Sequence, residues 1–503
     1  MAYEDAIEKQ LVSMDERSVF DLCDRENIPP DAELGRLAFI LSRKRSGAYK
    51  ARLIYNGSKQ RYRITDTYST PTLSAVSLRI ALAVAAERNF SFRTADVKTA
   101  FLYAQLPADA ILYAEVPDGY PNAAELRKTK VIRLRQAIYG LKESPLLWYR
   151  HLLHYLQQNL QLHQSIYDEC MLYNKDKTLF LLMYVDDLLL LGEPHRIHTA
   201  TTLIQKKFTI TSTEVNATVD FLGCNISRSD NGEYKLSQVT YLNNILTKYA
   251  RTLDVQHTPL PVTNHTTELA ELPVDTEYPY RQITGALGYL RYSRFDIVHA
   301  LNVIARTNKY PTVHQVQQLQ HLLGYLKKTE AQVLTFYGGS QTNNTLVALS
   351  DAEWAGRMST RRSLGGSFVY YNRTCIAASC KTQTVTATAA ASAELIEIYR
   401  TTKQLVHISG LLKEIGVQEL TTVILTDSQS SVDTTKRAVT ERSKHMAVYI
   451  HYIKEKLGKR FLVKHIPRQS NFADMLTKQS NKETFDRYWH AASTPFQWVH
   501  KLV

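Results

Sequence analysis

Residues 179–191 read LFLLMYVDDLLLL and place two adjacent acids, Asp186 and Asp187, between apolar runs. The runs Thr178–Leu182 and Leu188–Leu191 are typical of β-strands, so the stretch predicts a hairpin whose turn carries both carboxylates. Taken alone, such a pair is more often an ordinary turn, because Asp side chains bond to their own backbone there. The segment therefore predicts a sheet and leaves open whether its turn is catalytic or structural.

A third acid lies upstream at the end of a similar strand. The run Ser91–Val97 reads SFRTADV, in which Asp96 is the last polar residue. Carboxylates at strand ends can converge, and their hard oxygen atoms suit Mg²⁺. Three such acids fit the two divalent ions that phosphoryl transfer uses. We therefore expect Asp96 and Asp186 to bridge the ions and Asp187 to assist them.

The composition points to nucleic acid and to more than one domain. The 503 residues exceed what one hydrophobic core usually organises. Lys and Arg number 61 against 48 Asp and Glu, and the formal charge of +13 favours polyanions; a basic protein with a solvated surface is the alternative. Five cysteines show no zinc spacing, so buried, reduced thiols are expected. No secretory signal or membrane span is visible, which predicts a soluble intracellular protein.

Helical and strand periodicities alternate along the chain, which predicts a mixed α/β architecture. Two loop-rich breaks, residues 251–280 and 338–344, divide it. The resulting blocks are residues 1–238, 239–344 and 345–503. The middle block is expected to be helical, over residues 239–249, 280–292, 296–308 and 314–328. Its last helix carries a core-facing stripe of four leucines: Leu319, Leu322, Leu323 and Leu326.

The C-terminal block repeats the pattern of acids at the ends of regular elements. Asp351 and Asp427 each close an apolar, strand-like run, while Glu394 and Asp474 lie on predicted helices. Any one of these would more often be a surface carboxylate than a ligand. The set of four in this order favours a second two-metal site.

Ordered motifs carry a resemblance to a known family. In the first two blocks they are YKARLIYNGSKQ (49–60), ADVKTAFLYAQL (95–106), QAIYGLKESPLLWY (136–149), YVDD (184–187) and FLGCNI (221–226). With these the chain resembles the reverse transcriptases of Ty1/copia-type (pseudovirus) long-terminal-repeat retrotransposons. The last block resembles a ribonuclease H domain, in the copia version, in SDAEWAG (350–356), ASAELIEIY (391–399), LTDSQS (425–430), RSKHMAVYIHYIKE (442–455) and HIPRQSNFADMLTK (465–478).

The resemblance implies an α/β (α+β) fold: a right-hand polymerase of fingers, palm and thumb, followed by a ribonuclease H-like domain. Fingers and palm would occupy residues 1–238, a helical thumb or connection residues 239–344, and the ribonuclease H domain residues 345–503. Two Mg²⁺ ions per active site are implied, with Mn²⁺ as a substitute. The implied catalytic and metal-binding residues are Asp96, Asp186, Asp187, Asp351, Glu394, Asp427 and Asp474.

The resemblance also implies contacts with the incoming deoxynucleotide (dNTP). Lys50 and Arg52 lie in the segment that resembles the triphosphate-binding fingers; which of them touches phosphate stays open, and a solvated basic strand is the alternative. Phe101 falls five residues after Asp96, where the family places an aromatic steric gate against ribonucleotides, and a core position is its alternative. Tyr139 replaces the Gln that retroviruses use beneath the template and nucleotide, which leaves its nucleotide contact open.

The nuclease block departs from the related enzymes at one point. Cellular and retroviral enzymes often place a mobile His shortly before the last acid, whereas residues 467–474 hold none. His465 precedes this segment on an expected strand, and we interpret it as structural. His445 is interpreted as a helix start or a nucleic-acid contact, because no partner ligand has suitable spacing for a metal.

The implied function is that of an RNA- and DNA-directed DNA polymerase with ribonuclease H activity, which converts retrotransposon RNA into double-stranded DNA. Its implied partners are an RNA template, a tRNA primer, RNA–DNA hybrid and dNTPs, with the Gag and integrase of the same element; a homodimer stays open and no membrane is implied. The implied location is the cytoplasm, within virus-like particles, with nuclear entry alongside the DNA product left open. Two alternatives remain, a domesticated or decayed copy that binds RNA or hybrid without catalysis, and a hybrid nuclease with a vestigial polymerase.

Overall fold

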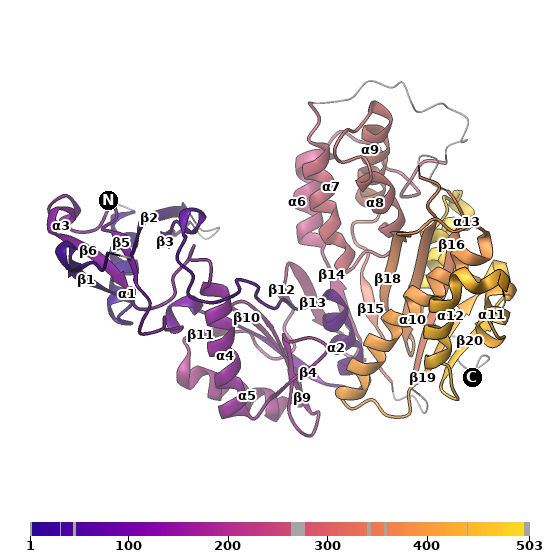
Figure 1. Cartoon of the computed structure of the whole chain (residues 1–503), viewed down its shortest axis with the longest axis horizontal. Coiled ribbons are helices and arrows are strands. Elements are labelled where there is room, and N and C mark those ends of the chain that lie inside the picture. The colour runs from indigo at the N-terminus through magenta and orange to yellow at the C-terminus, as the bar shows by residue number, and fades with distance from the viewer. Residues whose placement is uncertain are drawn as a thin grey trace.

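The structure is a computed structural model, and it describes residues 3–30, 32–43, 47–262, 277–339, 344–356, 360–439 and 441–496. Four β-sheets with flanking helices form an arch (Figure 1). The indigo N-terminal sheet lies at the left, a purple sheet forms the base, and helices stand above the base at the right. The C-terminal sheet lies beside these helices. We call these parts the fingers, the palm, the thumb and the nuclease domain.

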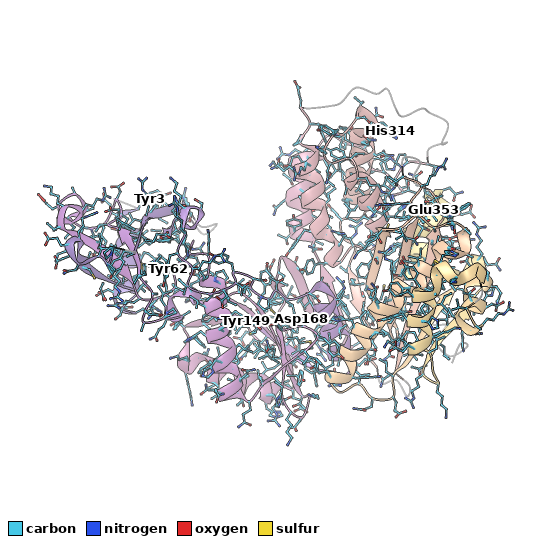
Figure 2. The ribbon with its side chains drawn as sticks, in the orientation of Figure 1. Tyr3, Tyr62, Tyr149, Asp168, His314 and Glu353 are labelled. Atoms are coloured by element: carbon cyan, nitrogen blue, oxygen red, sulfur yellow. The ribbon has the colours of Figure 1, made fainter. Side chains whose placement is uncertain are left out.

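The fingers are a five-stranded sheet in the order β1-β6-β5-β2-β3. Its strands are β1 (Phe20–Asp24), β6 (Lys130–Leu134), β5 (Leu112–Glu115), β2 (Glu33–Arg43) and β3 (Tyr49–Tyr55), with helices α1 (Glu4–Asp15) and α3 (Ala123–Thr129). All neighbouring strands are antiparallel except β2 and β5. The sheet returns to the palm through the segment around Tyr62, which Figure 2 labels between the two parts.

The palm is a six-stranded sheet in the order β11-β4-β10-β9-β8-β7. Its strands are β11 (Ile210–Ser212), β4 (Ser91–Val97), β10 (Asp187–Gly192), β9 (Leu179–Tyr184), β8 (Met171–Tyr173) and β7 (His163–Gln164), with helices α2 (Ala75–Glu87), α4 (Ser144–Leu160) and α5 (Pro194–Lys207). The predicted hairpin is therefore present as β9 and β10. Its leucine-rich strands are buried, because helices and further strands cover both faces.

The thumb consists of helices inserted between two strands of one small sheet. That sheet has the order β12-β13-β14-β15, from β12 (Val219–Phe221), β13 (Cys224–Arg228), β14 (Tyr234–Ser237) and β15 (Leu334–Phe336). Between β14 and β15 run the helices α6 (Val239–Tyr249), α7 (Tyr280–Gly288), α8 (Val298–Ala305) and α9 (Val313–Lys328). All four leucines of the predicted stripe on α9 are fully buried. Helices α7 and α8 are shorter than predicted, and α7 continues as a 3₁₀ turn over Tyr289–Tyr292.

The nuclease domain is a five-stranded sheet in the order β18-β17-β16-β19-β20. Its elements are β16 (Thr345–Glu353), β17 (Leu364–Tyr371), β18 (Thr374–Thr382), β19 (Thr421–Thr426), β20 (Phe461–His465), α10 (Ala390–Glu414), α11 (Gln429–Lys436), α12 (Ala447–Lys456) and α13 (Lys482–Ser493). Two details correct the sequence analysis. Strand β16 runs two residues past Asp351, because Asp351 pairs with Gly366 in the ladder. Asp474 lies in a short 3₁₀ segment, Phe472–Leu476, rather than in an α-helix.

Helix α2 joins the palm to the nuclease domain. Its residues 77–86 are all buried, which is the property of a helix covered on every side. It packs against β10 of the palm, β14 and β15 of the thumb sheet, and β18 of the nuclease sheet. Its first turn is capped by Ser74, whose backbone N–H is held by Asp168, a palm residue labelled in Figure 2. One hydrophobic core thus runs from the palm through the thumb into the nuclease domain.

Polar contacts fix the same junction. The buried Arg79 of α2 donates from Nε to the carbonyl oxygen of Ile376 (2.6 Å) and from Nη1 to that of Tyr292 (3.0 Å). Glu87, at the end of α2, accepts a 2.6 Å hydrogen bond from the Tyr371 hydroxyl and another from the Asn372 amide. Because unpaired buried polar groups are costly, these contacts specify one orientation of the nuclease domain.

The structure also bears on the predictions for the cysteines, for membrane spans and for the domain boundaries. All five cysteines are free, and four are buried; Cys23 is only half-buried, because it lies on the edge strand β1 of the fingers. None of the helices in the described ranges is long and apolar enough to cross a membrane. The boundaries at residues 238 and 344 stay predictions; β14 ends at Ser237 and α6 begins at Val239. Residues 263–276 and 340–343, within the two predicted breaks, lie outside the described residues.

Candidate active sites

The register of the palm sheet brings the first set of acids to one edge. Asp96 of β4 and Asp187 of β10 are direct partners across the antiparallel pair. Asp186 precedes Asp187 in the hairpin turn, and its carbonyl oxygen accepts a 2.9 Å hydrogen bond from the Val97 N–H. The two segments that sequence analysis singled out separately therefore meet at a single point.

Negative charges dominate the electrostatics of this edge. Burial raises the pKa of Asp187 to about 6, and the neighbouring charges of Asp186, Asp96 and Asp220 add to this shift. Burial and Asp96 also raise the pKa of Asp186. Asp220, on β12 of the thumb sheet, was missed by the sequence analysis. Carboxylates crowded in this way are stabilised by a divalent cation, so the donor set fits Mg²⁺.

The residues predicted to face the nucleotide gather beside these acids. The Arg52 guanidinium lies over the Tyr139 ring, 4.9 Å from its centroid, and the Phe101 and Tyr139 rings meet edge-on at 4.9 Å. The positive charges of Arg52 and Lys50 lower the pKa of Asp186 and partly offset the effect of burial. Both cations therefore lie on the side of the fingers that faces these acids. The arrangement is a wall of two cations and two aromatic rings next to three carboxylates.

The loop that carries Tyr139 is held against the fingers by its backbone. The Tyr55 N–H donates a 2.8 Å hydrogen bond to the carbonyl oxygen of Tyr139. Gly140 follows with φ of +87°, and a Cβ there would lie 2.1 Å from the Tyr55 carbonyl oxygen. Only glycine permits this approach. The contact fixes the distance between the fingers strand and the ring that would lie beneath the nucleotide.

The second set of acids forms a compact cluster in the nuclease domain. Single oxygen atoms of Asp351, Glu394 and Asp427 lie within 4.8 Å of one another, and among the described residues no other group of three acids, His or Cys does so. They come from the middle of β16, the first turns of α10 and the end of β19. Asp474 is not one of these three; it lies beside Asp351, and its Oδ1 is 2.6 Å from the Nζ of Lys478.

The cluster has an open ligand position. Burial raises the pKa of Glu394, and Asp351 and Asp427 add to the shift. Burial likewise raises the pKa of Asp351, with Lys478 opposing the shift and Asp474 adding to it. The Glu394 Oε2 atom is buried and has no hydrogen-bond partner. A buried carboxylate oxygen without a partner is costly, and a bound hard cation would satisfy it, so these residues fit a divalent ion.

Several supporting residues were missed by the sequence analysis, although all lie within its motifs. The fully buried Asn471 donates from Nδ2 to Asp427 Oδ1 and to the Ser350 carbonyl oxygen, both at 3.0 Å. The Thr477 hydroxyl donates to Asp351. Lys478 follows Asp474 by four residues, a helical spacing that could have marked it. Glu397, one turn after Glu394, is fully buried and bonded to Arg400 at 3.0 Å; its burial raises its pKa to about 8.

Neither histidine that the sequence analysis weighed joins the cluster. His465 ends β20, is exposed, and pairs with Thr426 in the parallel ladder. His445 is also exposed, in the 3₁₀ segment Glu441–Met446 that precedes α12. Among the described residues, the cluster therefore contains carboxylates and no imidazole ligand.

Residues 36–263 match the family model described as reverse transcriptase (RNA-dependent DNA polymerase). The chain contains a domain of this family. It is 31% identical over 458 residues to a Retrovirus-related Pol polyprotein from transposon RE1 of Arabidopsis thaliana, covering 88% of this chain and 30% of the relative. A Pol polyprotein from transposon TNT 1-94 of Nicotiana tabacum is 27% identical, covering 96% and 37%. The Transposon Ty1-NL2 Gag-Pol polyprotein of Saccharomyces cerevisiae is 24% identical, covering 98% and 28%.

These relatives confirm the resemblance to Ty1/copia-type retrotransposon reverse transcriptases, and the chain spans about a third of their length. Among solved structures, the foamy viral protease-reverse transcriptase in complex with double-stranded DNA matches with a TM-score of 0.56 and 12% identity, covering 92% of this chain and 69% of that one. The same viral protein with an RNA/DNA hybrid matches with a TM-score of 0.51 and 11% identity, covering 93% and 54%. At this identity the likeness concerns the fold alone, and it confirms the predicted fold class.

Proposed function

We propose that the chain is an RNA- and DNA-directed DNA polymerase with ribonuclease H activity, which converts retrotransposon RNA into double-stranded DNA. The observation that carries this proposal is the direct pairing of Asp96 with Asp187, next to Asp186 and in front of the wall formed by Arg52, Tyr139 and Phe101. Three converging carboxylates facing cations and aromatic rings suit a metal-bound triphosphate and a base.

In the polymerase site, each group has a distinct task. Asp96, Asp186 and Asp187 would hold two Mg²⁺ ions, which when bound activate the primer hydroxyl and neutralise the leaving diphosphate. Lys50 and Arg52 neutralise the triphosphate from the fingers side. Tyr139 supports the nucleotide, and Phe101 occupies the space that a ribonucleotide 2′-hydroxyl would need.

In the nuclease site, the four acids would serve hydrolysis of the RNA strand of a hybrid. Asp351, Glu394 and Asp427 supply the compact ligand set, and Asp474 lies on the far side of Asp351. The ion or ions held there would activate water and stabilise the departing 3′-oxygen. Recognition of the hybrid would rest on backbone and 2′-hydroxyl contacts rather than on sequence.

The partners follow from the same proposal. An RNA template, a tRNA primer, RNA–DNA hybrid and dNTPs are the substrates and ligands of this reaction. Similarity to a Gag-Pol polyprotein supports Gag of the same element as a partner. Integrase as a further partner and cytoplasmic virus-like particles as the location belong to the same proposal. A homodimer is compatible with the proposal and is tested by the mass of the protein in solution.

Two assays with matched variants test the proposal. Primer extension on a poly(rA) template should require Mg²⁺ and be lost in Asp186→Asn, while hybrid cleavage is retained. Asp427→Asn should lose hybrid cleavage and retain primer extension. The controls are the exposed acids Asp118 and Asp486, changed to Asn, which pair with Arg127 and Lys482 away from both sites. Hybrid binding without Mg²⁺-dependent synthesis or cleavage would instead support a non-catalytic binding protein.

A further inference from the structure

Lys478 places a positive charge between two acids of the nuclease site. Its Nζ lies 2.6 Å from Asp474 Oδ1 and 3.4 Å from Asp351 Oδ2. The Asp351 carboxylate is fully buried, and it also accepts a hydrogen bond from the Thr477 hydroxyl. The lysine is therefore a resident cation of the site.

This ammonium group links Asp351, a member of the compact cluster, to Asp474, which lies beside Asp351. Asp351 takes part in the compact cluster with Glu394 and Asp427, whereas Asp474 is turned toward Lys478. A second divalent ion at this site would need oxygen ligands beyond those that hold the first, and Asp351 and Asp474 could supply them. Lys478 sits where Asp351 and Asp474 would jointly offer oxygen atoms to that second cation.

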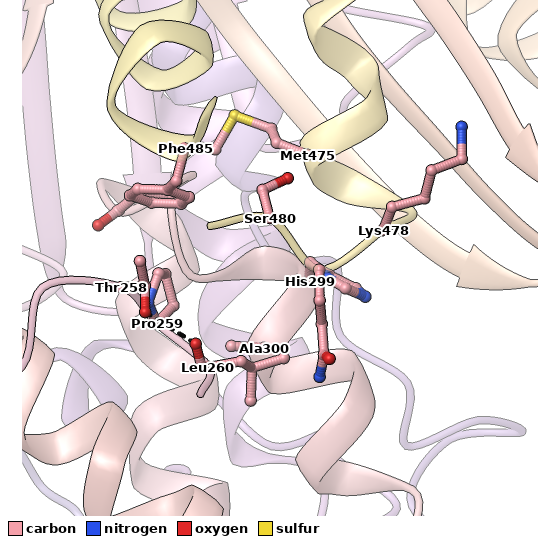
Figure 3. A pocket seen from close by; sticks show the side chains of 11 residues that line it. Thr258, Pro259, Leu260, His299, Ala300, Met475, Lys478, Ser480 and Phe485 are labelled. Atoms are coloured by element: carbon pink, nitrogen blue, oxygen red, sulfur yellow. Dashed lines mark hydrogen bonds between the residues drawn. The ribbon is translucent and has the colours of Figure 1, made fainter. Parts of the chain in front are cut away.

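The backbone of Lys478 is fixed beside the thumb. Lys478 lines a small pocket with His299 and Ala300 of α8 and with Met475. Its backbone N–H donates a 2.9 Å hydrogen bond to the Asp474 carbonyl oxygen. Figure 3 shows the Lys478 side chain extending away from the other lining residues. The ammonium group at its end reaches Asp351 and Asp474, and it can exchange partners without movement of the backbone.

We propose that Lys478 is a built-in cation that holds the place of the second divalent ion between Asp351 and Asp474. The inference rests on the proposed nuclease function and deepens it. The free chain then binds one divalent ion, at Asp351, Glu394 and Asp427. The second ion enters when a hybrid is bound, because a phosphate of the backbone supplies both a new partner for Lys478 and a further oxygen ligand for the ion.

Electrostatic repulsion supports this order of ion and hybrid binding. An ammonium at the distances seen here opposes a divalent ion at the same acids by direct repulsion, in a partly buried site where solvent screens little. Removing the lysine charge should therefore strengthen binding of the second ion by at least about tenfold. A nucleic-acid phosphate relieves the same repulsion by drawing the ammonium away.

Ion counting tests the proposal without reference to cleavage. The full chain carrying Asp186→Asn and Asp187→Asn, which lacks polymerase-site ligands, is titrated with Mn²⁺ and followed by electron paramagnetic resonance. We expect one tightly bound ion without hybrid. Anomalous scattering from Mn²⁺-soaked crystals should place it among Asp351, Glu394 and Asp427. Two equally tight ions in the free chain would overturn the proposal, whatever any variant does.

Variants then test the lysine itself. Lys478→Met, which keeps an unbranched apolar side chain and removes the charge, should bind a second ion between Asp351 and Asp474. Lys478→Arg should keep the count at one. The control is Lys482→Met, whose exposed ammonium pairs with Asp486 on α13. An unchanged count in a folded Lys478→Met protein would contradict the inference, and Lys478→Gln repeats the test if the Met variant does not fold. Absence of hybrid cleavage in a chain that binds its ions as predicted would refute only the proposed function.

Discussion

The Nε1 of Trp148 donates a 2.7 Å hydrogen bond to the carbonyl oxygen of Val185, the residue that opens the turn between β9 and β10. Val185 has φ of +54°, a left-handed conformation that is unfavourable for a β-branched residue. Strain of this kind persists only where surrounding contacts impose it. Helix α4 thus holds, through one indole, the turn that aims Asp186 and Asp187.

Replacing Trp148 with Phe should impair synthesis without affecting hybrid cleavage. The ring would still fill its buried space, but the turn would lose a hydrogen bond worth about 1 kcal/mol. We expect kcat for primer extension to fall about 5- to 10-fold, as measured in single-turnover assays. Tyr155→Phe is the control, since it removes a side chain to backbone hydrogen bond from the same helix to Leu203. An equal loss in both variants would count against a specific role for Trp148.

Phe101→Val should relax the selection against ribonucleotides. The smaller side chain would leave room for a 2′-hydroxyl, and we expect the ratio of ribonucleotide to deoxynucleotide incorporation to rise by roughly tenfold or more. Tyr139→Phe should leave the ratio unchanged, because the ring that packs against Phe101 remains. If Phe101→Val still rejects ribonucleotides, Phe101 is a core residue rather than a gate.

Glu394→Gln should make the metal-free chain more stable and reduce its stabilisation by Mg²⁺. Without a divalent ion, the carboxylate is buried beside Asp351 and Asp427, so the neutral amide should stabilise the folded chain by about 1–2 kcal/mol. The wild-type chain should gain stability when Mg²⁺ is added, and the variant should gain much less. Melting temperatures with and without Mg²⁺ measure both effects. Glu397→Gln, which removes the next buried carboxylate on α10, should keep the Mg²⁺ response.

His299 should make the chain less stable in mild acid. Burial, aided by Arg306, lowers its pKa to about 4 in the folded protein, whereas an unfolded chain protonates near 6.5. The unfolded state therefore binds the extra proton between these values, and stability falls as the pH drops from about 6.5 toward 4. The loss approaches about 3 kcal/mol at the lower limit.

The test of this pH dependence is a denaturation series at several pH values. His299→Gln should have a flatter profile between pH 6.5 and 4 than the wild type. His314→Gln, on helix α9 and labelled in Figure 2, should retain the wild-type profile. Parallel profiles for all three proteins would show that the pKa of His299 is the same in the folded and unfolded chain.

The sequence predicted those parts of the sites that depend on local pattern. Strand β4 has the predicted bounds, and the hairpin of β9 and β10 lies within two residues of its predicted place, because unbroken apolar runs identify buried strands. The positions of Asp351 and Glu394 on a strand and a helix followed in the same way. Ordered motifs then identified the family.

Most of the contacts missed by sequence analysis join residues far apart in the chain. The sequence alone does not pair Lys478 with Asp351, because the two residues are 127 positions apart and meet only in the folded chain. Helix α2 shows no polar face, and its sequence does not reveal that the nuclease sheet covers it. Such pairings depend on the tertiary arrangement, which local propensity does not encode.

Helix α2 also sets the spacing between the two active sites. It belongs at once to the core beneath the palm and to the core beneath the nuclease sheet, so the described residues of the two candidate sites rest on one continuous core. If one duplex occupies both sites, its RNA strand is cut at a constant lag behind the growing DNA end. The fixed distance between the two sites would then determine the length of the RNA fragments, and this length would not depend on the sequence of the template.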